Sequence, residues 1–537
     1  MTIARRIRGT AAWVVAIAMV SACNAISGVS DYEFPYAECF PDEVISCYSG
    51  PPMTQDIGVC RAGQRRCSEE GAQFGSCEGE VTPGPVDNCA TPQDDNCDGK
   101  AGPQCTGAPL WVKAFGSGFS ETQQGNDVGA VADGRVILCG AFDIGFELAP
   151  EVTVENTKDT TSSFVAGLTP GGDGVWAVGE ASSSSAEVPR VALGMAVGRD
   201  DGSAYVVGND SLSLYAQKLS GAGAVLWEKQ FGSGMDGAVA THGSGLVLIG
   251  SSMGAIDFGG GSLPPAGDSD AVVASLTAAG DHVWSRRFGA EGEQLGRSIA
   301  TDAGNNVVVA GCFQGTIDLG CTPALIDSSG KRALFVARLS PAGECLWSQT
   351  FPFQHNNQDC KPRVAADASG SVLFAASLEG EIDFGGEPLP EGGNADIVVA
   401  KFGPDGSHLW SKRFGDNYDQ TVEDAAFDVS GNVLLTGSFL GQLNFGDTGL
   451  EKAPTELMSR DGFVVKFDPA GNLVWSLPLA STNNAYGLGV TGDRVGNVLV
   501  TGWFDGNLTV GDLTAEGGQG GPGGQWGRAI FVAKLSP

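Results

Sequence analysis

Histidine is scarce in this chain, and basic residues are far fewer than acidic ones. The 537 residues include 4 histidines, 31 lysines and arginines, and 63 aspartates and glutamates, so the formal net charge is −32 at pH 7. Such a surface repels the phosphates of nucleic acids, which excludes nucleic acid as a partner. No Ser/His/Asp order, phosphate loop or metal-ligand cluster can be assembled with specificity. We therefore expect a non-enzymatic protein without a required cofactor.

Long hydrophobic runs are also missing. The apolar run near the start, residues 11–20, is too short to span a bilayer comfortably, and it follows the basic residues Arg5, Arg6 and Arg8. Residues 1–22 are therefore predicted to be an export signal. The following V-S-A-C at 20–23 resembles a bacterial lipobox, which implies a diacylated Cys23 as the mature N-terminus. A plain secretory peptide is the alternative. Because Asn24 follows rather than aspartate, the resemblance implies the outer membrane or cell surface of a Gram-negative bacterium.

Cysteine, in contrast, is concentrated after a short tether at residues 23–38. Eight cysteines fall within residues 39–107: Cys39, Cys47, Cys60, Cys67, Cys77, Cys89, Cys97 and Cys105. In a small exported unit that cannot bury enough apolar surface, they indicate four disulfides, with the pairing left open. A zinc site is the competing interpretation, but it is disfavoured because histidines and paired C-x-x-C motifs are lacking.

An Asp-rich loop lies inside this segment. Asp94, Asn96 and Asp98 occupy positions 1, 3 and 5 of an EF-hand-like calcium loop, with Gly99 at the turn. Cys105 stands where the bidentate glutamate belongs, so a full EF-hand is excluded. Calcium is thus a possible ligand, and the alternative is an acidic turn stapled by Cys89 and Cys97. Residues 39–99 resemble the Cys-rich, Asp-rich metal-binding segments of myxobacterial secreted lipoproteins.

A repeat of about sixty residues occupies the rest of the chain, residues 108–537. Seven tryptophans mark its register: Trp111, Trp176, Trp227, Trp284, Trp347, Trp410 and Trp475. The clearest copy, residues 396–446, predicts strands at 398–402, 408–414, 424–428 and 433–439, with Trp410 and Phe414 on one face. Four short strands per unit, separated by glycine-rich turns, are typical of a propeller blade.

The two ends of the array are complementary. Trp111 lacks the strand that ends eight residues before the other tryptophans, whereas the strand at 531–535 lacks a tryptophan hairpin. Pairing them would close a ring of seven blades and leave no free edge. The fold class is therefore an all-β, seven-bladed propeller preceded by a disulfide-rich domain. The repeat, with V-V-A-K-F, W-S-x-x-F-G and T-G-x-F motifs, resembles the bacterial beta-propeller repeat family known as SBBP, whose members are mostly exported proteins without an assigned reaction.

The remaining polar and sulfur residues receive structural interpretations. We expect Cys312 to pair with Cys321 and Cys345 with Cys360, which leaves Cys139 as a buried, unreactive thiol. The recurrent aspartates are expected to serve turns rather than a ring of cation sites. They are Asp257, Asp318 and Asp383 in one motif and Asp302, Asp367 and Asp428 in another. Trp503 and Trp526 are the only loose aromatic candidates for sugar stacking.

Together these patterns predict a lipid-anchored surface propeller that binds a protein or a glycan. The membrane would be contacted through the N-terminal lipid. The alternative is an exported propeller enzyme of quinoprotein, lyase or glycosidase type. That enzyme would need arginine, histidine or carboxylate side chains to converge in the central funnel.

Overall fold

The computed structural model describes residues 39–68, 73–83, 94, 97, 106–116, 122–156, 160–180, 189–198, 201–210, 213–322, 326–353, 360–446, 449–452, 459–517 and 527–537. The chain divides into two compact units, residues 1–83 with 97–99 and residues 84–96 with 100–537. The expected division at residue 107 stays a prediction. Within the described ranges no helix has the length and apolar character needed to cross a membrane. Residues 1–38, including the expected signal and Cys23, lie outside the described residues.

The first unit is a small disulfide-linked structure. Strands β1 (Val44–Cys47) and β2 (Gly63–Arg66) pair antiparallel. Three disulfides are present in the described part: Cys39–Cys67, Cys47–Cys77 and Cys60–Cys97. Cys97 therefore bonds to the loop before β2, and the alternative of a turn stapled by Cys89 and Cys97 is wrong. Cys89 and Cys105 lie outside the described residues.

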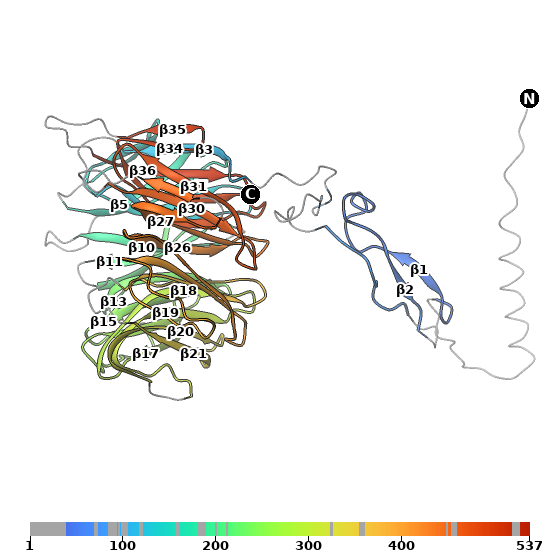
Figure 1. Ribbon diagram of the computed structural model, residues 1–537, viewed down its shortest axis with the longest axis horizontal. Coiled ribbons are helices and arrows are strands. Elements are labelled where there is room, and N and C mark those ends of the chain that lie inside the picture. Colours follow the sequence, from blue (N-terminus) through green and yellow to red (C-terminus); the bar gives the residue numbers. More distant parts are fainter. Residues whose placement is uncertain are drawn as a thin grey trace, which may run out of the picture. The chain divides into compact units, whose positions relative to one another are not determined.

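The second unit is a seven-bladed β-propeller, as the repeat predicts (Figure 1). Each blade is an antiparallel sheet. From the innermost strand outward, blade 1 is β4 (Gln124–Ala130), β5 (Val136–Phe142), β8 (Ser162–Leu168) and β9 (Gly174–Glu180). In the same order, blade 2 is β10 (Arg190–Val197), β11 (Ala204–Asp210), β12 (Ser213–Leu219) and β13 (Val225–Ser233). Blade 3 is β14 (Met235–His242), β15 (Gly245–Ser252), β16 (Asp270–Leu276) and β17 (His282–Phe288).

The remaining blades are built in the same way. Blade 4 is β18 (Gly292–Thr301), β19 (Val307–Ile317), β20 (Ile326–Leu339) and β21 (Cys345–Pro352). Blade 5 is β22 (Arg363–Ala366), β23 (Val372–Leu378), β24 (Asp396–Phe402) and β25 (His408–Phe414). Blade 6 is β26 (Gln420–Phe427), β27 (Val433–Phe439), β30 (Asp461–Phe467) and β31 (Leu473–Ser481). Blade 7 is β32 (Ala485–Gly492), β33 (Val498–Asp505), β36 (Arg528–Leu535) and β3 (Pro109–Phe115).

Short hairpins connect the second and third strands of three blades. They are β6 (Phe146–Ala149) with β7 (Val152–Val154), β28 (Gly441–Asn444) with β29 (Gly449–Lys452), and β34 (Asn507–Val510) with β35 (Leu513–Glu516). In the last case β34 also pairs with β31, the outer strand of the preceding blade. This hairpin therefore joins two neighbouring blades.

The sequence repeat is offset from the blade. The four strands predicted within residues 396–446 are present, and Trp410 packs against the same cluster as Phe414. However, β24 and β25 are the outer strands of blade 5, whereas β26 and β27 are the inner strands of blade 6. The prediction that one repeat copy is one blade is therefore wrong, because the chain crosses to the next blade between its second and third strands.

The predicted ring closure is confirmed. Strand β36 pairs with β3, with Phe115 opposite Ile530 and Trp111 opposite Lys534, and Figure 1 shows β3 beside the red strands from the end of the chain. The alternate residues Phe531, Ala533 and Leu535 are fully buried and share one hydrophobic cluster. Blade 7 thus takes three strands from the end of the array and one from its beginning.

The two disulfides of the propeller do not follow the predicted pairing. Cys312 bonds to Cys360 and Cys321 bonds to Cys345, so both proposed pairs are wrong. Cys312 faces blade 5 from the middle of β19, where it packs in one cluster with Cys360. Cys321 follows β19 and lies beside the start of β21. Cys139 is a buried free thiol, as expected.

Candidate functional site

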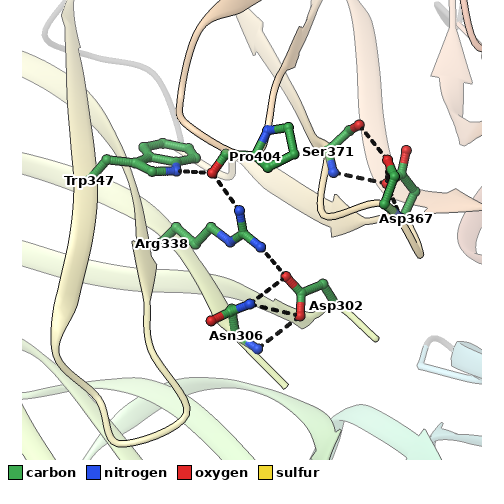
Figure 2. A network of polar contacts seen from close by, with 8 residues as sticks. Asp302, Asn306, Arg338, Trp347, Asp367, Ser371 and Pro404 are labelled. Atoms are coloured by element: carbon green, nitrogen blue, oxygen red, sulfur yellow. Dashed lines mark hydrogen bonds and ion pairs between the residues drawn. The ribbon is translucent and has the colours of Figure 1, made fainter. Parts of the chain in front are cut away.

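The recurrent aspartates and tryptophans form contacts that hold neighbouring blades together (Figure 2). In blade 4, the Asp302 carboxylate accepts hydrogen bonds from the backbone and side chain of Asn306 and from Arg338. Arg338 also donates to the carbonyl oxygen of Pro404 in blade 5, and the Trp347 indole N–H donates to the same oxygen at 2.9 Å. Burial opposes ionisation of Asp302, but these hydrogen bonds and Arg338 hold its pKa below the ordinary value.

This arrangement recurs around the ring. The acid–base pair is repeated in the next three blades: Asp367–Lys401 at 3.6 Å, Asp428–Lys466 at 2.8 Å and Asp493–Lys534 at 2.9 Å. Six tryptophans donate to a turn carbonyl of the following blade: Trp111 to Pro170, Trp176 to Gly221, Trp227 to Ala278, Trp284 to Pro341, Trp347 to Pro404, and Trp410 to Pro469. Asp257, Asp318 and Asp383 accept from glycine N–H groups two residues later. The expected turn roles are confirmed.

Trp475 is the exception among the seven. Its ring is buried and packs on Gly107, as Trp347 packs on Gly406, but its indole N–H has no partner within the described residues. The turn that would supply the carbonyl is the place where the two ends of the array meet. There the Ser536 N–H donates to the Ala108 carbonyl at 2.8 Å and replaces part of the missing turn.

The first candidate site is the central channel, a cavity of about 460 Å³ lined by the innermost strands of all seven blades. A β-bulge interrupts six of these strands at about the same position, for example between Gly125 and Asp127 and between Val422 and Asp424. A bulge re-aims side chains, and bulges are frequent beside functional sites. At the bulge of β14, Asp236 has a φ of 60°, a strained value for a non-glycine residue.

Two carboxylates of this channel wall, Asp127 and Asp424, are held in the same way. Each accepts the N–H of the following residue, and each also accepts an N–H from the next blade at 2.8 Å, Met195 for Asp127 and Val490 for Asp424. Burial raises the pKa of Asp127 to about 7, assisted by the charge of Asp424. Burial likewise raises the pKa of Asp424 to about 6. Both groups therefore titrate near neutral pH.

Other charges of the channel are paired. Arg297 of β18 binds Asp236 of β14, and Arg363 of β22 lies 3.6 Å from the Glu423 carboxylate of β26. Arginines and carboxylates thus converge in the channel, which sequence analysis missed. The only available signal in the sequence was that charged residues recur near the start of the innermost strands. The bulges add a residue to these strands, so the charged positions do not align from one repeat to the next.

The residues predicted as a site have different outcomes. Asn96, Asp98 and Trp526 lie outside the described residues, as does Cys23. Asp94 is buried, and the described part of the chain contains no group of three or more His, Cys, Asp or Glu residues placed to hold a metal. Calcium binding stays a prediction. Trp503 is only 9% exposed, so it is not a free stacking platform.

The fold and channel define this chain as a closed seven-bladed β-propeller with a polar channel. No family model matches it, so the resemblance to the SBBP family stays a prediction. It is 22% identical over 233 residues to the "Uncharacterized WD repeat-containing protein L264" of Acanthamoeba polyphaga mimivirus, a match that covers 42% of this chain and 13% of that protein.

Solved propellers are also similar. The Dos1 propeller is 10% identical with a TM-score of 0.40, covering 80% of this chain and 94% of that one. The Cps50 (Swd1) propeller of Myceliophteria thermophila is 9% identical with a TM-score of 0.38, covering 79% and 99%.

Proposed function

We propose that this protein is an exported binding module, anchored to a membrane by a lipid on Cys23. Its ring would present a rigid surface to a protein or glycan partner, without catalysis. Rigidity is supported by the closed ring and by the contacts that join each blade to the next. The recurrent polar residues are engaged in these contacts, so binding specificity would come from positions where the blades differ.

The observation that carries export is the state of the described cysteines. Ten of them form five disulfides, and the one remaining thiol, Cys139, is buried. Disulfides persist in oxidising compartments and are rare in reducing ones. This supports the same compartment that the predicted signal at residues 1–22 implies.

The anchor is tested by labelling cells with a fatty acid analogue and comparing wild type with Cys23→Ser. We expect label in the wild type, none in Cys23→Ser, and release of the variant from the membrane fraction. Cys139→Ser is the matched control and should keep its label. Equal labelling of wild type and Cys23→Ser would refute the anchor.

A second candidate, an enzyme with its site in the channel, is favoured by one specific observation. Asp127 and Asp424 are two buried carboxylates of the channel wall whose pKa values are raised, and such groups cluster at catalytic sites. Reducing-end release from acidic and neutral polysaccharides would test it. Release that disappears in Asp127→Asn with Asp424→Asn would favour the enzyme, and the absence of release by the wild type would count against glycosidase and lyase activity.

A further inference from the structure

One arginine position recurs in three blades. The three residues are Arg332 of blade 4, Arg460 of blade 6 and Arg528 of blade 7. In each of these blades, a phenylalanine near the end of the second strand pairs with a residue of the neighbouring third-strand segment, and the arginine directly precedes that residue. Those pairs are Phe313 with Ala333, Phe439 with Asp461, and Phe504 with Ala529. The three arginines therefore occupy equivalent places at the same end of their blades.

Two of these arginines are neutralised by an acid from their own blade. Arg332 binds Glu293 at 2.5 Å, and Arg460 binds Asp419 at 2.8 Å. Each acid immediately precedes the residue that pairs with the phenylalanine, Gln294 with Phe313 and Gln420 with Phe439. The acid and the arginine thus approach one another from the inner and the third strand.

In blade 7 the acid is absent. Ala485 pairs with Phe504, so the preceding residue, Asn484, takes the place of Glu293 and Asp419. Arg528 has no ion pair or hydrogen bond with the described residues. Asp505 lies directly opposite Arg528 and accepts hydrogen bonds from Asn484, whose backbone N–H donates at 2.6 Å and whose side chain donates at 3.3 Å.

Arg528 instead rests on an aromatic pair. Its guanidinium carbon lies 4.0 Å from the centre of the Trp503 ring, and Trp503 stacks on Tyr486 with 4.6 Å between ring centres and 16° between planes. Trp503 is largely buried, and no hydrogen bond joins its indole N–H to the described residues. The positions equivalent to Tyr486 and Trp503 in other blades are occupied by Thr421 with Ser438, Leu295 with Cys312, and Gln124 with Ala141. The fold therefore does not require this aromatic pair.

We propose that Arg528, on the Trp503–Tyr486 stack, binds the carboxylate of an acidic sugar in a glycan. A guanidinium presents a planar fork of N–H groups that matches a carboxylate, and stacking on an indole orients that fork in advance. The indole N–H and the Tyr486 hydroxyl supply further donors for the oxygen atoms of a sugar.

Two of the other charges near the stack have partners of opposite sign. Burial raises the pKa of the Tyr486 hydroxyl, and the charges that act on it are Arg460, Glu423, Arg528 and Asp505. Arg460 is paired with Asp419 and Glu423 lies beside Arg363, whereas Asp505 accepts hydrogen bonds from the neutral Asn484 and keeps its charge. Of the two arginines, Arg528 is thus the one without an ion pair among the described residues. The inference rests on the proposed binding function and specifies the chemistry of the glycan.

The test is calorimetric titration of the purified full chain with an oligogalacturonate and with its methyl ester, which removes only the charge. We expect the acid to bind at least tenfold more tightly than the ester. Arg528→Gln should weaken acid binding at least tenfold. Asn484→Asp should do the same although Arg528 remains, because it restores the acid that neutralises the equivalent arginines. Arg460→Gln, in the neighbouring blade, should bind like wild type.

Melting curves would show that each variant is folded. Trp503→Phe gives a second readout, because it keeps the ring and removes the unpartnered N–H, and it should weaken binding without unfolding. Equal binding of acid and ester, undiminished binding by Arg528→Gln, or no binding by wild type would overturn the proposal. Binding of polyglutamate in preference to the sugar acid would also overturn it, in favour of an acidic protein. Labelling of Cys23 is independent of every one of these results.

Discussion

Ring closure through β36 should account for a large part of the stability of the propeller. Four large apolar side chains of this strand, Ile530, Phe531, Val532 and Leu535, are fully buried, on both faces of the sheet. Burial of such a side chain contributes roughly 1.5–3 kcal/mol, so together they contribute on the order of 6–12 kcal/mol. That is comparable to the whole stability of a typical domain, about 5–15 kcal/mol. Deleting residues 530–537 should therefore unfold or open the ring.

The assay is thermal unfolding combined with size-exclusion chromatography. The truncated protein should melt at a much lower temperature and self-associate, because β33 and β3 each lose a pairing partner. Deleting residues 536–537 is the control, since it leaves β36 complete and should have a much smaller effect. A monomeric truncation at 530 with an unchanged melting temperature would refute the reasoning.

Three further predictions concern single contacts. Trp347→Phe removes the indole hydrogen bond to Pro404, whereas the N–H of Trp475 has no partner in the described residues. Trp347→Phe should therefore lower the free energy of unfolding by about 1 kcal/mol more than Trp475→Phe, and equal losses in the two variants would contradict this. The pKa values of Asp127 and Asp424 in the folded state are raised above about 4, so the folded state binds more protons than the unfolded state, and stability should fall as pH rises from about 4 to 7. The double variant Asp127→Asn with Asp424→Asn should flatten that part of the profile of melting temperature against pH. Cys312→Ser with Cys360→Ser should lower the melting temperature and leave Cys321–Cys345 intact by peptide mapping, whereas recovery of a Cys312–Cys321 peptide from wild type would contradict the pairing.

The sequence was sufficient to predict those features that follow from the spacing of the repeat and from the alternation of side chains along one strand. Seven tryptophans predicted seven blades, and the missing strand before Trp111 predicted its pairing with residues 531–535. The turn roles of aspartates such as Asp302 and Asp428 were also predictable, because an aspartate bonds to backbone N–H groups only two to four residues away. In each case the interacting groups are close in sequence or are repeated with the unit.

Contacts between blades were decided only by the tertiary structure. Cys312 pairs with Cys360 rather than with nearby Cys321 because its side chain faces the next blade, and sequence distance carries no information on that direction. Asp127 and Asp424 both line the channel because the ring brings β4 and β26 to the axis. Arg528 lacks the acid that binds Arg332 and Arg460 because Asn484, about forty residues away, takes its place, and the strand register that makes these residues neighbours exists only in the folded blade.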